Sequence, residues 1–210
     1  MLQSVIDNIF VKVNTKYISN MSDIMRLSAI QHNSSLDASD LVNIMGEVVS
    51  VPKIISSKIE NKGYSLNNIQ PGDIAIFSYL VISEVIPIPE SVDVIFKNRI
   101  WYEGQELFAV NIKNLYGVIR DGEIIMLNGY TMVGEFVESK LVIPHHLRRL
   151  NKAAKSELMH IGEPKEDEPY LSANGGDSVY INPFSATKYQ IGGKKFCIVT
   201  QNKILGKKIF

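Results

Sequence analysis

The sequence predicts an all-β protein, and three features of its pattern support this prediction. The apolar residues occur in runs of four to seven that are rich in Val, Ile, Phe and Tyr. Gly, Asn, Asp and Pro separate these runs, which is typical of sandwiches and barrels built from short strands. Few windows show the 3.6-residue apolar period of an amphipathic helix.

The predicted strands follow one another along the chain, with two gaps. The gaps are residues 14–45 and 138–155, where polar residues dominate and strand signals are weak. A loop above ~15 residues in a compact domain is usually functional or disordered, although a tolerated surface insertion is the simpler interpretation. The predicted strands are 9–13, 46–51, 72–77, 106–112, 116–119, 123–127, 130–137, 156–162, 178–181, 195–199 and 203–210.

Two windows in these gaps could each form a helical turn. They are residues 35–45, which Ser35, Asp37 and Ser39 could cap, and residues 145–155. A mobile segment is the alternative for both windows, and we expect 138–155 to be mobile.

Composition and charge exclude several classes of protein. A chain of 210 residues suits one large domain or two small ones and can bury a core without disulfides. Its 22 basic and 22 acidic residues give zero net charge, which argues against a dedicated nucleic-acid binder. The single cysteine, Cys197, excludes a disulfide framework and has the apolar neighbours of an inert core thiol. No secretory signal and no apolar run near the ~20 residues of a membrane span is visible, so we expect a cytoplasmic protein that binds no membrane.

The order of the strand segments repeats between the two halves of the chain. Each half contains a strand that ends in a polar, turn-rich segment, and then a Gly-Asp pair that opens the next strand. Such internal order predicts two domains built to the same plan. The matched pairs are 46–53 with 156–165, Gly72-Asp73 with Gly176-Asp177, and 104–119 with 193–209, which aligns Phe108 with Phe196 and Gly117 with Gly206.

The second half resembles the GroES-like co-chaperonins, most clearly in residues 175–209, GGDSVYINPFSATKYQIGGKKFCIVTQNKILGKKI. This segment is similar to the family's closing pattern: a Gly-Asp strand, a Gly-Gly turn followed by Lys, and a strand ending in Ile-Leu-Gly. The family order extends from about Ile124 to Phe210. The first half keeps the order more loosely, and residues 78–103 have no counterpart in a single-domain chain of the family.

The resemblance implies a fold of two tandem GroES-like, partly open β-barrels. We expect the first barrel in residues 1–123, with the long loop 14–45 and the insertion 78–103. The second barrel is expected in residues 124–210, with a docking loop at 138–155. Two strand edges are candidates for pairing with a neighbouring chain, because open edges are a liability unless they are covered. These candidates are residues 203–210 and Ile9–Val13.

The resemblance also implies a docking site, since the family carries a branched-apolar tripeptide, often followed by Pro, in the loop after its first strand. A buried strand end is the alternative for the same residues. The first-half candidate has Arg26 where the third apolar residue belongs, so we expect the second half to supply the docking loop. The candidate docking residues are Leu141, Val142, Ile143 and Pro144 in the second half and Ile24, Met25 and Leu27 in the first.

Other polar or aromatic positions have simpler interpretations. The basic residues at 145–149 have no acidic or cysteine partner nearby in sequence, so we expect a solvated loop rather than a metal or phosphate site. The charged residues at 163–168 suggest either a solubilising turn or, as the resemblance implies, a polar ceiling over a folding chamber. Trp101 is expected to be a packing or interface residue.

The resemblance implies a co-chaperonin that caps the cavity of an ATP-driven, GroEL-like chaperonin, encloses non-native proteins and assembles into a homo-oligomeric ring. The sequence contains no GxSxG, P-loop or HExxH motif, and we expect no enzymatic activity, cofactor or metal. A non-catalytic, OB-like barrel that binds nucleic acid or a ligand is the alternative, which the neutral charge disfavours. The GroES-like domain of a medium-chain dehydrogenase ranks last, because no GxGxxG follows a predicted strand.

Overall fold

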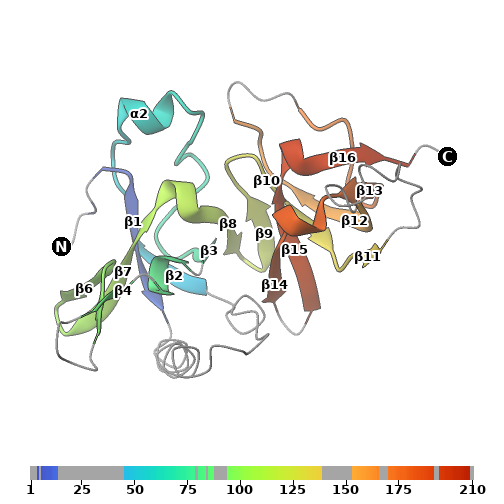
Figure 1. The fold of residues 1–210 in the computed structure, drawn as a ribbon. Helices are drawn as coiled ribbons and strands as arrows, with labels where there is room; N and C mark the ends of the chain where they lie inside the picture. Colours follow the sequence, from blue (N-terminus) through green and yellow to red (C-terminus); the bar gives the residue numbers. More distant parts are fainter. Residues whose placement is uncertain are drawn as a thin grey trace.

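The computed structural model describes residues 4, 6–13, 45–78, 80–83, 85–87, 94–138, 153–165, 170–191 and 194–208. Within these ranges the chain is nearly all β, and every strand pair is antiparallel. Two large sheets form the two halves of the molecule, the first on the left of Figure 1 and the second on the right. The predicted all-β fold class is confirmed.

The first sheet has seven strands, and its central strands alternate between core and solvent. In β1, for example, Val11 and Val13 are buried whereas Lys12 between them is exposed, as the two-residue period of a strand requires. In hydrogen-bonded order the strands are β6 (Arg99–Tyr102), β7 (Gln105–Asn111), β1 (Asn8–Val13), β2 (Met45–Ser50), β3 (Ile74–Phe77), β8 (Leu115–Arg120) and β9 (Glu123–Met126).

The second sheet has the same kind of alternation, most regularly along β12. The short strand β11 (Val137–Glu138) pairs with β12 beside the main order of this sheet. That main order is β14 (Thr187–Ile191), β15 (Lys194–Thr200), β10 (Tyr130–Gly134), β12 (Ala154–Ile161), β13 (Ser178–Ile181) and β16 (Ile204–Lys207).

The remaining described elements are short. The insertion expected at 78–103 contains helix α3 (Leu80–Ser83) and the hairpin of β4 (Val85–Pro87) and β5 (Val94–Phe96). Its last residues were wrongly included, because they form β6, which corresponds to β14 of the second half. The other helices are α2 (Ser57–Glu60) and the 3-10 turns η2 (Ile112–Asn114), η3 (Pro183–Ser185) and η4 (Gln201–Lys203). The possible helical turns at 35–45 and 145–155 fall largely outside the described residues. Their described ends, Met45 and residues 154–155, are strand.

Six strands occur in the same order in both sheets. The order β6-β7-β1-β2-β3-β8 of the first sheet corresponds to β14-β15-β10-β12-β13-β16 of the second. The register shifts occur at matching places: between Phe10 and Val11 and between Met132 and Val133, where the first strand of each half meets the second. The third strands shift in the same way when they meet the last strands, after Ile76 and after Tyr180.

These registers correct one pairing inferred from the sequence. Phe108 pairs with Val11, and the residue that pairs with the corresponding Val133 is Cys197, not Phe196. Phe108 therefore corresponds to Cys197, one residue from the sequence alignment. Gly117 and Gly206 do correspond, since they pair with Ile76 and Tyr180 at the matching register shifts.

A second correction concerns the predicted edges. Ile9–Val13 lies in β1, which is hydrogen-bonded to β7 on one side and to β2 on the other, so it is a central strand and not an edge. Within the described chain, β16 pairs with β13 alone, so the expected edge at residues 203–210 is confirmed for Ile204–Lys207.

Each sheet encloses its own apolar core, and a third apolar cluster lies between the two sheets. The first core includes Val11 and Phe108, and the second includes the corresponding Val133 and Cys197. The third cluster joins strands β3, β8 and β9 of the first sheet to strands β10, β14 and β15 of the second. Its fully or nearly buried members are Ile76, Tyr116, Met126, Met132, Tyr189, Phe196 and Ile198.

Candidate docking and assembly surfaces

All the predicted docking residues lie outside the residues that the structure describes. These are Leu141, Val142, Ile143 and Pro144 in the second half and Ile24, Met25 and Leu27 in the first. The structure does describe the strands to which their segments are attached. It therefore fixes where the two candidate docking segments leave and re-enter the sheets.

Both segments connect the first strand of a half to the second. Residues 14–44 join β1 to β2, where Val13 pairs with Gly46. Residues 139–152 join β11 to β12, where Glu138 pairs with Ala154. Residues paired across an antiparallel ladder lie only about 5 Å apart, so each segment starts and ends at neighbouring points of a sheet.

The strands that follow the two segments, β2 and β12, differ at one position close to the segments. Gly46 is the second residue of β2, and a Cβ there would lie 3.0 Å from the Lys12 carbonyl oxygen, so the close approach of β1 favours glycine. The corresponding residue of β12 is Ser156, whose hydroxyl donates to the Gly134 carbonyl at 2.7 Å. A Cβ at Gly134 would lie 3.8 Å from the Ser156 hydroxyl, which is an ordinary contact. A serine at this position is therefore compatible with the same strand pairing.

The charged segment at 163–168 is described as far as Lys165, and it is attached to the first half. Within the second half, Gly129 N–H donates to the Glu163 carbonyl at 2.8 Å, and the Lys165 ammonium reaches the first half, where it lies 4.5 Å from the centre of the Tyr64 ring. A cation over an aromatic face is attractive. The described base of this segment thus joins the two halves, while its expected charged tip at 166–168 lies outside the described residues.

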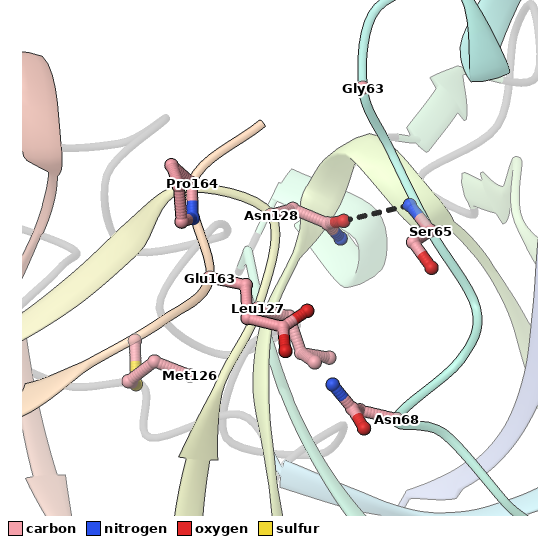
Figure 2. Close-up of a pocket in the computed structure, with 8 residues that line it drawn as sticks. All are labelled: Gly63, Ser65, Asn68, Met126, Leu127, Asn128, Glu163 and Pro164. Carbon is pink, nitrogen blue, oxygen red and sulfur yellow. Dashed lines mark hydrogen bonds between the residues drawn. The ribbon is translucent and has the colours of Figure 1, made fainter. Parts of the chain in front are cut away.

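A small hollow lies where this segment meets the first half (Figure 2). Its volume is about 30 Å³, room for roughly one water molecule and far below a small-molecule site. Asn128 stands at one side of it and accepts a hydrogen bond from Ser65 N–H at 3.1 Å. Asn68, on the same loop as Ser65, and Glu163, on the segment facing that loop, also line it. The hollow serves the connection between the halves and is too small for a cofactor.

The described residues contain no cluster of potential metal ligands. Among the described residues, no group of three or more His, Cys, Asp or Glu side chains could hold a metal ion. Cys197 is buried, and this burial raises the pKa of its thiol to about 11. The thiol is protonated at neutral pH, so the prediction of an inert core thiol is confirmed. None of the described helices is long and apolar enough to cross a membrane.

The two sheets face each other across the third apolar cluster, and aromatic rings lie at the centre of this contact. The ring of Tyr116 lies edge-on to Tyr130, with centroids 4.8 Å apart, and to Tyr189, at 6.3 Å. The Tyr189 hydroxyl donates to the buried Phe77 carbonyl of the first sheet at 2.6 Å. Burial raises the pKa of the Tyr130 phenol, which stays neutral at physiological pH. We call this contact the internal junction.

Strand β9 belongs to this junction and completes the first sheet. It pairs with β8 from Gly117–Met126 to Arg120–Glu123 and so covers the edge that β8 would otherwise expose. Sequence reasoning placed residues 123–127 in a strand but had no signal for its partner. In Figure 1, β9 lies between the two halves of the molecule.

Two large side chains remain exposed on edge strands away from the junction. Leu205 on β16 is 57% exposed, and Trp101 on β6 is 67% exposed. This exposure excludes a role for Trp101 in packing within the described chain and leaves the expected interface role. Apolar side chains on open strand edges are the usual sites of pairing with another chain.

Residues 122–208 match the model of the protein family described as the chaperonin 10 Kd subunit. The match spans 87 of the 210 residues, from β9 to the end of β16, and so covers the whole second sheet. It supports a co-chaperonin function in general and a GroES-like fold for this half. That family works with a GroEL-like chaperonin and is not catalytic. A comparison with curated proteins finds no match.

Proposed function

We propose that the protein is a co-chaperonin that caps the cavity of an ATP-driven chaperonin and assists protein folding without catalysing a reaction. The main observation behind this proposal is the family match over the second sheet. The attachment of residues 139–152 supports it, because this segment connects the first and second strands of the matched half and contains the Leu-Val-Ile-Pro sequence. The protein would act in the cytoplasm and need no cofactor.

The first half is, in this proposal, a second GroES-like barrel, with domains at 1–123 and 124–210. Three observations support it: the shared order of six strands, the matching register shifts, and the equivalent Gly-Asp turns. The insertion with α3 and the β4–β5 hairpin is the main structural difference between the two. The first half lies outside the family match, so its barrel rests on these internal correspondences.

Docking is assigned to the second half. Burying three branched apolar side chains in a groove contributes about 1.5–3 kcal/mol each before the cost of ordering the segment. Arg26 interrupts the equivalent apolar run of the first half, and an unpaired charge in an apolar groove is costly. One segment binds weakly, but several in one ring bind firmly through avidity.

A chain with two barrels also restricts the number of chains that can form a closed ring. Three or four chains would give six or eight barrels if both barrels of each chain enter the ring. Seven chains would match a sevenfold chaperonin only if one barrel of each chain forms the ring. Either arrangement leaves the docking segment of the second half available.

The first prediction tests docking directly. Val142→Asp should abolish a complex with a GroEL-like chaperonin formed in the presence of ATP, as seen by size-exclusion chromatography, because the charge cannot be accommodated in an apolar groove. Leu147→Asp is the matched control: it makes the same change in the same segment but outside the apolar tripeptide, and it should leave the complex intact.

Three results would contradict this assignment. Absence of any complex with the unaltered chain would argue against the co-chaperonin function. Unfolding of Val142→Asp in a thermal melt would place Val142 in the barrel core instead. Loss of the complex with Ile24→Asp and Leu27→Asp, but not with Val142→Asp, would move the docking site to the first half.

A further inference from the structure

The sequence contains two Asn-Gly pairs, Asn128-Gly129 and Asn174-Gly175, and the structure places them in different surroundings. Asparagine followed by glycine is the pair most prone to spontaneous deamidation, because glycine has no side chain to hinder attack by its backbone nitrogen on the asparagine amide. The reaction needs a backbone N–H that is free to react and an asparagine side chain that can move to meet it. The two pairs can be compared on both requirements.

The first pair is held in place by hydrogen bonds. Asn128 is only 6% exposed, and its side-chain oxygen accepts from Ser65 N–H at 3.1 Å, as Figure 2 shows. The N–H of Gly129, which would have to attack, donates to the Glu163 carbonyl at 2.8 Å. Deamidation of Asn128 therefore requires the structure around it to open first.

The second pair lies in an exposed turn that leads into β13. Asn174 and Gly175 are both exposed, and Asp177 N–H donates to the Asn174 carbonyl at 3.0 Å, which closes the turn. Gly176 has a φ of 90°, as the third residue of a type II turn requires. Among the described residues, no hydrogen-bond acceptor contacts the Gly175 N–H. Both requirements for the reaction are thus met at this pair.

The equivalent turn of the first half lacks both reactive groups. It spans residues 70–73, Gln-Pro-Gly-Asp, and has the same positive φ at its third residue and the same closing hydrogen bond, 3.2 Å long. Pro71 takes the place of Gly175 and has no N–H with which to attack. Gln70 takes the place of Asn174, and its longer side chain would have to close a less favourable six-membered ring. The same turn is therefore reactive in one half only.

We propose that Asn174 is a site of spontaneous deamidation in the folded protein, whereas Asn128 is protected. The Gly175 nitrogen loses its proton to hydroxide and attacks Cγ of Asn174, which forms a five-membered cyclic imide. The side-chain nitrogen takes up a proton and leaves as ammonia. Water then opens either carbonyl of the ring and gives aspartate or isoaspartate. The reaction needs only water, so the inference goes beyond the proposed function and does not depend on it.

The product changes both the charge and the length of the turn. It adds one negative charge to a chain whose net charge is zero. The new carboxylate lies beside Asp177, which accepts from the Asn174 N–H at 2.9 Å and lies 3.5 Å from the Lys207 ammonium. Isoaspartate also routes the backbone through Cβ, which lengthens the turn by one bond and displaces its closing hydrogen bond. The modified chain should therefore be more acidic and have a looser turn before β13.

The test follows deamidation of the full, folded chain by peptide mass spectrometry during incubation at mildly alkaline pH, where the backbone nitrogen loses its proton more readily. The peptide with Asn174 should convert roughly tenfold faster, or more, than the peptide with Asn128, because a reaction that requires local opening is slowed by the free energy of that opening. In urea, where the chain is unfolded, the two pairs should convert at similar rates. Isoelectric focusing should show the corresponding acidic form.

Two variants copy the turn of the first half and serve as controls. Gly175→Pro removes the attacking N–H, and Asn174→Gln lengthens the side chain. Both should keep the fold, since the first half uses these residues in the same turn and the φ of Gly175 is not positive. Both should suppress conversion at position 174. An Asn174 that stays intact in the folded chain, an Asn128 that converts equally fast, or conversion that persists in Gly175→Pro would overturn the inference.

Discussion

At the scale of single residues, Asp73 and Asp177 form the same hydrogen-bonded turn in the two halves, but they have different charged partners. The Asp73 carboxylate accepts from Gln70 N–H at 2.9 Å, and Asp177 accepts from Asn174 N–H at the same distance. The glycine before each aspartate has a positive φ, 93° at Gly72 and 90° at Gly176, which explains why both positions need glycine. The Gly-Asp pairs seen in the sequence are therefore the clearest local feature that it predicted correctly.

Asp73 alone has a strong partner in the sheet. Arg120 donates to its two carboxylate oxygens, both at 2.8 Å, and the Asp73 side chain is almost fully buried. Burial alone would raise the pKa of this carboxyl, but the hydrogen bonds from Arg120 and Gln70 and the Arg120 charge outweigh it and lower the pKa. Asp177 has only the longer contact of 3.5 Å to Lys207 at the surface.

Asp73→Asn should therefore lower the free energy of unfolding by about 2 kcal/mol at neutral pH, a typical value for a buried, charge-assisted hydrogen bond. A carboxyl whose pKa is lower in the folded state stabilises above its unfolded pKa of about 4, and this contribution is lost as the pH falls through the folded pKa. Urea unfolding of both proteins from pH 7 to pH 2.5 should show the difference shrinking below about pH 4. The partly exposed Asp177→Asn is the control, with a smaller effect; a difference independent of pH would contradict the role of the Asp73 charge.

At the scale of elements, the sequence predicted where the strands lie along the chain better than which strands pair with one another in the sheets. Runs such as 178–181 and 195–199 became β13 and β15 almost as predicted, because alternation and turn residues act locally. The single run at 130–137 became β10 and β11, separated by residues 135–136. Ile9–Val13 was wrongly taken as an edge, because the position of a strand in a sheet depends on distant pairings that its own residues do not encode.

The internal junction is the feature that the sequence did not predict. Its contributors, such as Ile76 and Phe196, lie in strands whose other face fills the apolar core of their own half, so each run is apolar on both faces. From the sequence alone, this pattern indicates only a buried strand. The predicted docking residues at 141–144 and 24–27 lie outside the described residues, and their role stays a prediction.

The junction hydrogen bond supplies a prediction at this scale. Tyr189→Phe should lower the free energy of unfolding by about 1–2 kcal/mol, because it leaves the buried Phe77 carbonyl without this donor. Tyr116→Phe is the matched control, since it keeps an aromatic ring at the same cluster, and it should cost less. Chemical denaturation measures both variants, and equal losses would contradict the importance of the Tyr189 hydrogen bond.

At the scale of the whole molecule, the two halves are joined by a shared apolar cluster, by β9 and by the loop contacts around Asn128. Interfaces of this kind couple the stabilities of the parts they join, whereas a flexible linker would let each half unfold alone. The chain should therefore behave as one cooperative unit, although its sequence suggested two domains joined near residue 123.

Differential scanning calorimetry should show one unfolding transition, with equal calorimetric and van't Hoff enthalpies. Phe196→Ala, which removes a large side chain from the shared cluster, should destabilise the chain by about 3–5 kcal/mol and lower that transition. Two well-separated transitions in the unaltered chain would show that the junction does not couple the halves.

Strand β9 also determines how the chain could be divided. The family match begins at residue 122, so by sequence β9 belongs with the second half, yet its hydrogen bonds complete the first sheet. A fragment ending before β9 would expose the edge of β8, and open edges invite aggregation. A fragment ending after β9 would deprive the second half of the strand with which its family match begins. No cut near this point yields two intact domains, so the two halves would have to be expressed together as one chain.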